Sequence, residues 1–277
     1  MNVTLICLPF AGASAAVYRE WRTLLPSWIR LHALDYPGHG AKRAQPALHR
    51  WPDVADALGR EALPAIEAIE GPFAIFGYSM GALAGLELAH WLRCGHGLMP
   101  VWFGAAACAA PACRTIDKTW LDSSDEALID ELRRLDATPE ELLGDRGFLD
   151  LALPVLRADF HLCATYVRPS NALRAPLACP LVALGGKNDS LSEQFESLSA
   201  WKHETSGQFT QRLIDGGHFF IDTARTELVD AIVTSIKDAL TTAASANPRC
   251  HAGASNAASR TAIIDSAGAA GPRSFHS

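Results

Sequence analysis

The sequence G-Y-S-M-G at positions 77–81 constrains the fold of this chain more than any other stretch. The apolar run 73–76 before it has the pattern of a buried strand, and residues 82–92 after it are good helix formers. A serine therefore stands at a strand-to-helix corner, where a Cβ at either flanking glycine would collide with the turn. The pentapeptide alone also occurs by chance, so its flanks are what favour a reactive serine hydroxyl beside free helix N–H groups.

Strand-like and helix-like segments alternate along much of the chain. A helical pattern over residues 51–70, for example, separates two apolar strand patterns. Such alternation predicts βαβ units and hence an α/β fold, with a mostly parallel sheet that carries helices on both faces. The strand patterns lie at 3–8, 31–34, 73–76, 101–107, 181–184 and 209–214.

One long segment, at about residues 111–174, interrupts this alternation. It shows no strand pattern and is acidic and helical, with Asp159 among its carboxylates. Capping patterns at 123–126 and 138–141 predict helix starts, and Pro154 predicts a kink or a restart. Because the segment follows the strand after the serine corner, we expect a lid over the carboxyl edge of the sheet; a merely decorative hairpin is the alternative.

The 277 residues, of which 49% are hydrophobic, suffice for one large domain. We predict that this domain spans residues 1–244 and includes the helical insertion. Residues 245–277 are mostly Ala, Ser, Gly, Asn and Thr, with little to bury, and we expect a disordered tail there.

Charge and residue usage narrow the range of partners. A net charge of −6 without a Lys/Arg cluster argues against nucleic acid, and the histidine and cysteine spacings predict neither a metal nor a cofactor. The seven cysteines are widely spaced and odd in number, which is typical of reduced thiols in the cytoplasm. No apolar run approaches the ~20 residues that a membrane span needs.

A reactive serine needs a base, and the base needs an orienting carboxylate. In parallel sheets of this kind the partners follow the serine in the order Asp or Glu, then His. Asp189 follows the strand pattern at 181–184 and His218 follows that at 209–214, each after a Gly-Gly pair. We therefore predict that Ser79, Asp189 and His218 form a catalytic triad at one edge of the sheet.

Alternatives exist for two members of this triad. Asp189 lies in an Asn-Asp-Ser sequence that also suits a plain turn, and Asp215 is its best substitute. His218 could instead begin a helix or lie in a solvated loop. His39 and His203 are the other loop histidines that could act as the base.

An oxyanion hole requires two converging N–H donors. We predict that one is Met80, directly after the serine, and that the other comes from the small-residue loop after the first strand. Ala11 is the favoured residue of that loop, with Phe10 as its neighbour.

Together these motifs resemble the type II thioesterases, stand-alone α/β-hydrolases that accompany nonribosomal peptide and polyketide synthetases. The likeness runs from about Val3 to about Leu240, and the segment 153–160 is the best discriminator because general esterases lack it. Ala13 departs from the pattern, since a second glycine usually ends the first loop, and residues 245–277 have no family counterpart. The matching stretches are L-P-F-A-G-A-S (8–14), D-Y-P-G-H-G (35–40), G-Y-S-M-G (77–81), L-P-V-L-R-A-D-F (153–160), A-L-G-G with Asp189 (183–189) and G-G-H-F-F (216–220).

The resemblance implies that Ser79, Asp189 and His218 are the triad and that the insertion is a mobile lid. It also implies the hydrolysis of acyl groups from the phosphopantetheine thiol of acyl- or peptidyl-carrier domains, which frees mis-primed or stalled synthetases of antibiotic or siderophore pathways. We expect a cytoplasmic monomer that binds neither nucleic acid nor membrane.

Three other functions fit parts of the pattern. A carboxylesterase or lipase acting on free small esters would use the same triad. A catalytically silent hydrolase fold could only dock onto synthetase domains, although the complete triad argues against this. An excised terminal thioesterase domain that cyclises its product is the third, and a chain that begins at Met1 directly in a strand favours the discrete protein.

Overall fold

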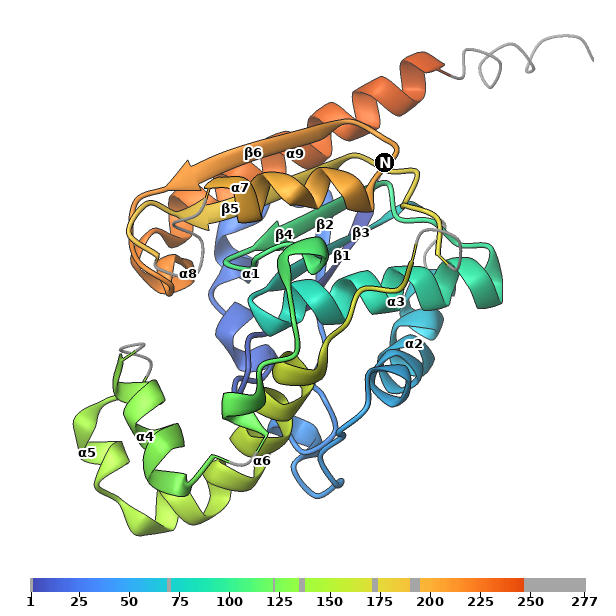
Figure 1. Ribbon diagram of the computed structural model, residues 1–277. Helices are drawn as coiled ribbons and strands as arrows, with labels where there is room; N and C mark the ends of the chain where they lie inside the picture. Colours follow the sequence, from blue (N-terminus) through green and yellow to red (C-terminus); the bar gives the residue numbers. More distant parts are fainter. Residues whose placement is uncertain are drawn as a thin grey trace, which may run out of the picture.

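A parallel β-sheet forms the centre of the protein (Figure 1). The computed structural model describes residues 2–68, 71–121, 123–134, 138–170, 174–189 and 195–246. Within these ranges the strand order is β2-β1-β3-β4-β5-β6, and every neighbouring pair is parallel, which confirms the predicted α/β class. The strands are β1 (Val3–Leu8), β2 (Ile29–Ala33), β3 (Phe73–Tyr78), β4 (Trp102–Ala106), β5 (Leu181–Gly186) and β6 (Phe209–Ile214).

Helices cover both faces of this sheet, as predicted. Successive strand residues point to opposite sides, so Ile6 joins the core under α2 and α3, while Leu5 joins the core on the face of α1 and α9. All residues of the four inner strands are buried, as expected for a sheet covered twice, whereas the edge strands β2 and β6 are largely half-buried or exposed. The helices packed on the sheet are α1 (Trp21–Leu24), α2 (Trp51–Glu67), α3 (Met80–His96), α7 (Phe195–Ser199), α8 (Phe220–Thr223) and α9 (Arg225–Ala246).

The helical insertion comprises α4 (Asp125–Arg134), α5 (Glu140–Leu143) and α6 (Arg146–Thr165). In Figure 1 it lies apart from the sheet, in green to yellow-green. A small core of its own, made of Leu132, Leu143 and Leu156, joins the three helices. The described residues thus contain the predicted insertion between β4 and β5.

Several predicted boundaries of the insertion were wrong in detail. Ser124 rather than Ser123 caps α4, because its Oγ accepts the N–H of Ala127 at 3.2 Å. At α5 the N-cap is Pro139, which makes no side-chain capping bond. Pro154 neither ends nor restarts α6, which runs through it to Thr165.

The segments before β2 and after β6 each form two helical pieces. Before β2, a 3-10 turn at Ala15–Tyr18 is followed by the short α1. After β6, α8 is followed by α9, which continues to Ala246. The tail predicted for 245–277 lies, from residue 247 onward, outside the described residues.

Candidate active site

Ser79 occupies the corner between β3 and α3 in a strained backbone conformation. Its φ of 53° and ψ of −117° lie in a region that side chains with a Cβ rarely adopt, at a cost of about 1–3 kcal/mol. The N–H of Ser79 donates to the carbonyl of Ala106 at 2.8 Å, which ties the corner to β4. The strain is therefore held by the sheet, and the serine lies beside the N-terminus of a 17-residue helix.

The flanking glycines allow this corner to pack against neighbouring backbone. A Cβ on Gly77 would lie 2.0 Å from the carbonyl oxygen of Gly81, and a Cβ on Gly81 would lie 2.1 Å from that of Leu8. In both cases the added Cβ would meet backbone atoms, which cannot move aside as the end of a side chain can. The collision expected from the sequence is therefore present at both glycines.

We expect Gly81→Ala to destabilise the protein severely. The new methyl group would force β1 away from the corner, at a cost of at least about 3 kcal/mol. Thermal unfolding should show a melting temperature several degrees lower than that of the wild type. Gly95→Ala is the matched control, because Gly95 lies in the same helix and a Cβ there meets nothing within 4 Å. That variant should be unchanged or slightly more stable, and equal melting temperatures for both variants would contradict the prediction.

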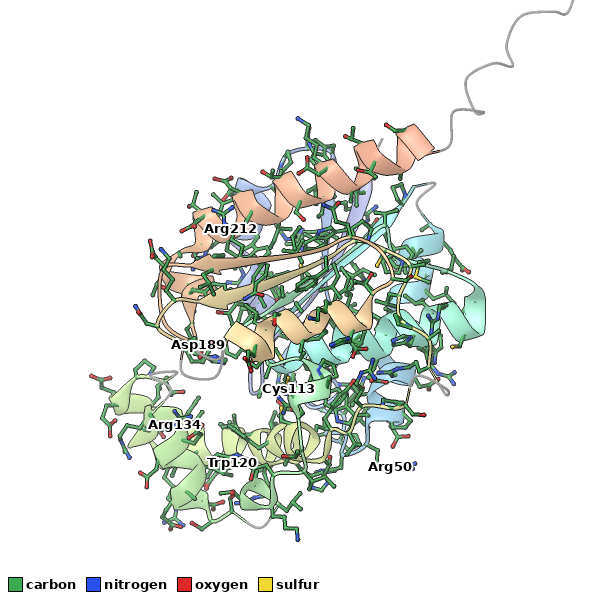
Figure 2. All side chains as sticks on the ribbon, turned by 45° about the horizontal axis from the view of Figure 1, so that its top comes forward. Arg50, Cys113, Trp120, Arg134, Asp189 and Arg212 are labelled. Atoms are coloured by element: carbon green, nitrogen blue, oxygen red, sulfur yellow. The ribbon has the colours of Figure 1, made fainter. Side chains whose placement is uncertain are left out.

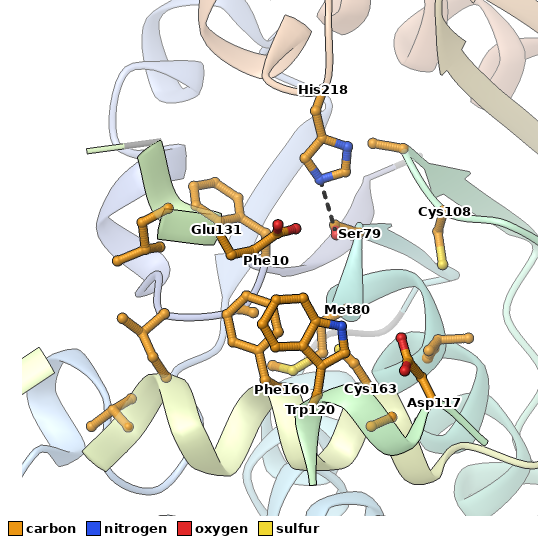
Figure 3. Close-up of a pocket in the computed structure, with 18 of the residues that line it drawn as sticks. Phe10, Ser79, Met80, Cys108, Asp117, Trp120, Glu131, Phe160, Cys163 and His218 are labelled. Atoms are coloured by element: carbon orange, nitrogen blue, oxygen red, sulfur yellow. Dashed lines mark hydrogen bonds between the residues drawn. The ribbon is translucent and has the colours of Figure 1, made fainter. Parts of the chain in front are cut away.

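Three predicted residues meet at the carboxyl edge of the sheet. His218 Nε2 lies 3.2 Å from Ser79 Oγ (Figure 3). His218 Nδ1 lies 2.9 Å from Asp189 Oδ2. Asp189 is buried at 1% exposure, and the His218 side chain is 9% exposed. A carboxylate behind an imidazole that faces a hydroxyl can remove the hydroxyl proton and hold the resulting charge.

The loops after β5 and β6 bring Asp189 and His218 together. A Cβ on Gly186 would lie 2.5 Å from the carbonyl oxygen of Gly217, so the two loops approach to backbone contact. The N–H of Asn188 also donates to the carbonyl of Gly216 at 3.0 Å. The lack of side chains in the two Gly-Gly pairs thus allows the neighbouring loops to approach this closely.

The alternative residues do not reach Ser79 in the described structure. Asp215 has a side chain 77% exposed and forms an ion pair with Lys187. His203 is exposed on the 3-10 turn Ala200–Glu204. His39 is buried, but its ring contacts Asp159 rather than the serine.

The predicted oxyanion donors lie beside the serine. Ala11 and Met80 line the same cavity as Ser79, and neither of their N–H groups has a hydrogen-bond acceptor among the described residues. Gly12 takes the left-handed position of this turn with φ 77°, and the N–H of Ala13 donates to the carbonyl of Phe10 at 3.1 Å. An alanine at position 13 is therefore compatible with the turn. We call residues 10–13 the oxyanion loop.

A cavity of about 840 Å³ opens beside Ser79. The insertion forms much of its wall, and the rings of Trp120 and Phe160 lie 4.8 Å apart along it (Figure 3). Trp120 and Arg134 lie on the side of the insertion that faces Asp189 (Figure 2). A mostly apolar chamber of this size suits an acyl chain. Its apolar lining includes Leu83, Leu132, Phe148, Leu151, Val155, Leu156 and Phe160.

The sequence did not predict a second buried pair next to the cavity. His39 Nε2 lies 2.8 Å from Asp159 Oδ2, and the same oxygen accepts the N–H of Gly12 at 2.7 Å. Burial acts to lower the pKa of His39, but the hydrogen bond and charge of Asp159 outweigh it, so the pKa is raised. Both residues fall in stretches quoted for the family resemblance, yet nothing in the sequence places them in contact.

Within the ranges that the structure describes, no group of three or more His, Cys, Asp or Glu side chains is placed to hold a metal ion. The same ranges contain no helix of the length and apolarity that crossing a bilayer requires.

Comparisons with known proteins agree with this geometry. The family profile described as "Thioesterase domain" matches residues 3–239. The gramicidin S biosynthesis protein GrsT of Aneurinibacillus migulanus is 32% identical over 236 residues, which are 85% of this chain and 90% of that protein. Thioesterase PikA5 of Streptomyces venezuelae is 35% identical over 221 residues, which are 79% of this chain and 76% of that protein. The structure of BorB, a type II thioesterase from the borrelidin biosynthetic cluster, superposes with a TM-score of 0.73 and 33% identity over 85% of this chain and 93% of that one. This chain therefore belongs to the thioesterase family, as a type II thioesterase with the α/β-hydrolase fold.

Proposed function

We propose that this thioesterase hydrolyses acyl groups from the phosphopantetheine arm of acyl- or peptidyl-carrier domains, and so clears mis-primed or stalled synthetases. The observation that carries this proposal is the hydrogen-bonded series Ser79–His218–Asp189, of which Ser79 and His218 line a mostly apolar cavity. The named pathways of the relatives, gramicidin S and borrelidin, support a carrier-bound substrate. We propose that the enzyme acts in the cytoplasm, in keeping with its cysteine usage, and as a monomer.

The first half of the reaction acylates Ser79. His218 Nε2 takes the proton from Oγ as Oγ attacks the thioester carbonyl carbon. The N–H groups of Met80 and Ala11 donate to the oxyanion of the tetrahedral intermediate. The C–S bond then breaks, and the departing sulfur takes the proton from His218; a thiol leaves readily because its pKa is far below that of an alcohol.

The second half hydrolyses the acyl-serine. His218 removes a proton from water as the water oxygen attacks the acyl carbon, and the oxyanion returns to the same two N–H donors. The C–Oγ bond breaks, Oγ recovers its proton from His218, and the free acid leaves. Throughout, Asp189 accepts the Nδ1–H of His218, which fixes the tautomer and stabilises the imidazolium.

A comparison of carrier-bound and free substrates tests this proposal. We expect kcat/KM for an acyl group on a phosphopantetheinyl carrier domain to exceed that for the p-nitrophenyl ester of the same acid by at least roughly 10-fold, because docking of the carrier adds binding energy. Mass spectrometry of the carrier follows acyl loss, and the Ser79→Ala protein supplies the background. Faster turnover of the free ester would favour the carboxylesterase function. Absence of turnover, together with no labelling of Ser79 by a fluorophosphonate, would favour the silent docking fold.

A further inference from the structure

The structure assigns Asp159 a role as a positioning residue that orients the oxyanion loop through hydrogen bonds to Gly12 and His39. This inference rests on the proposed function, since it concerns the loop that carries the Ala11 donor. Asp159 comes from helix α6 of the insertion, 147 residues from Gly12 along the chain. It contacts the loop after β1 through Gly12 and the loop after β2 through His39, and it affects catalysis only through these contacts.

One carboxylate oxygen makes both contacts. Asp159 Oδ2 accepts the N–H of Gly12 at 2.7 Å and lies 2.8 Å from His39 Nε2. Asp159 is 2% exposed and His39 is 4% exposed, so water does not compete for these bonds. Charge-assisted hydrogen bonds in such a place are strong and directional.

The geometry favours a positive charge on His39. Its Nδ1 lies 3.2 Å from the carbonyl oxygen of Pro37, and its Nε2 faces the Asp159 carboxyl group. A proton on each ring nitrogen lets His39 donate to both of these oxygens. Although burial lowers the pKa of His39, its hydrogen bond and charge interaction with Asp159 raise that pKa overall, in the same sense.

Helix α6 supports the oxyanion loop at two neighbouring points. Leu156 lies one turn before Asp159, and a Cβ on Gly12 would be 2.6 Å from its Cδ2. Fixing the Gly12 N–H restrains the preceding dihedral angle of Ala11, and with it the direction of the Ala11 N–H. Catalysis is sensitive to such placement, since an error of about 1 Å can cost roughly 10²-fold in rate.

Other ionisable groups face the buried pair. The Tyr36 ring lies 5.4 Å from the His39 ring, and its hydroxyl donates to the carbonyl of Pro9 at 2.9 Å. The charge of Asp35 also raises the pKa of His39. Cys163 of α6 is near Asp159, and burial chiefly raises its pKa to about 12, with a further contribution from Asp159. The positive charge of His39 in this pair is therefore lost as pH rises through the raised pKa of His39.

Asp159→Asn tests the positioning role, with Asp150→Asn as its control. Asp150 is an exposed residue of the same helix. We expect Asp159→Asn to lower kcat by roughly 10- to 100-fold, with KM within about 3-fold of the wild type. The control should keep both values. A kcat for Asp159→Asn within about 2-fold of the wild type would overturn the inference.

Two inhibitors separate positioning from a general structural effect. A trifluoromethyl ketone carrying the substrate acyl chain forms an oxyanion with Ser79, whereas the corresponding thioether does not. Asp159→Asn should raise the Kd of the ketone by the same factor by which it lowers kcat/KM, and it should leave the Kd of the thioether unchanged. An equal increase in the Kd values of both compounds would overturn the positioning role.

A second variant keeps the test decisive if Asp159→Asn does not fold. His39→Gln preserves an N–H donor toward Asp159 but has no proton to lose at alkaline pH. The wild-type kcat should fall as pH rises through the pKa of His39, and this fall should be absent from His39→Gln; an identical decline in both would overturn the inference. The wild-type comparison of carrier-bound and free substrates tests the proposed function separately, since its outcome does not depend on the role of Asp159.

Discussion

Replacing Ser79 with alanine is expected to reduce thioester hydrolysis by roughly 10⁴- to 10⁶-fold without unfolding the protein. The substitution removes only the oxygen that attacks the carbonyl carbon. Its hydrogen-bond partner in the described structure is His218 Nε2 at 3.2 Å, on the cavity side of the corner. Alanine keeps the same Cβ, so the strained backbone with φ 53° gains no new clash. Single-turnover release of an acyl group from a carrier domain measures the loss, and thermal unfolding checks the fold.

A matched substitution elsewhere shows that the loss is specific. Ser199 lies on the short helix α7, where its Oγ donates to the carbonyl of Glu196 at 3.0 Å. Ser199→Ala removes an equivalent hydroxyl that does not line the cavity, and its kcat should stay within about 2-fold of the wild-type value. If purified Ser79→Ala released acyl groups at the wild-type rate, Ser79 would not be the nucleophile, and the mechanism proposed above would fail with it.

The serine corner could be predicted because its determinants are local. A buried strand, two glycines around a serine and an apolar helix stand side by side in the sequence, and backbone sterics leave few other conformations for them. Asp189 and His218 could be predicted for a topological reason. In a parallel sheet all strands end at one edge, so loops that follow different strands meet there. The positions of these two residues thus required only the strand pattern and not the details of packing.

The pair of His39 and Asp159 could not be predicted in the same way. The two residues are 120 positions apart, and their contact depends on where α6 docks against the loops after β1 and β2. Sequence periodicity indicates that a helix forms, but not which loop it touches. From the sequence alone, Asp159 is therefore one of several carboxylates of an acidic insertion, and His39 is only an alternative base on a loop. Burial and two short hydrogen bonds distinguish them from solvated charges only once the helix is placed.

The insertion also shows where local rules yield to tertiary contacts. Pro154 breaks one hydrogen bond of a helix, which favours a kink or a restart. Nevertheless α6 continues to Thr165, with Leu153 and Leu156 buried on either side of the proline. Packing of an apolar face can exceed the cost of a single proline when the helix has neighbours on that side. Such compensation depends on contacts between distant segments and leaves no signal in a short window of sequence.

Asp189→Asn is expected to lower kcat by roughly 10⁴-fold while leaving KM nearly unchanged. Asp189 is 1% exposed and its Oδ2 lies 2.9 Å from His218 Nδ1. As a carboxylate it only accepts, which places the imidazole proton on Nδ1 and leaves Nε2 free to take the proton of Ser79. An asparagine amide that donates to Nδ1 would place the proton on Nε2 instead, and Nε2 could then no longer act as a base. The charge that stabilises the imidazolium is lost as well. Steady-state kinetics on an acyl-carrier substrate measures both parameters.

Asp215→Asn is the matched control and also decides between the two carboxylates that the sequence left open. Asp215 lies in the loop after β6, three residues before His218, but its side chain is 77% exposed and pairs with Lys187. An exposed ion pair of this kind contributes at most about 1 kcal/mol, so its loss should change kcat by less than about 2-fold. A large loss in Asp215→Asn with little loss in Asp189→Asn would reverse the assignment. Large losses in Asp189→Asn alone would instead identify the buried carboxylate as the partner of His218, because only that side chain can fix the imidazole tautomer from behind the ring.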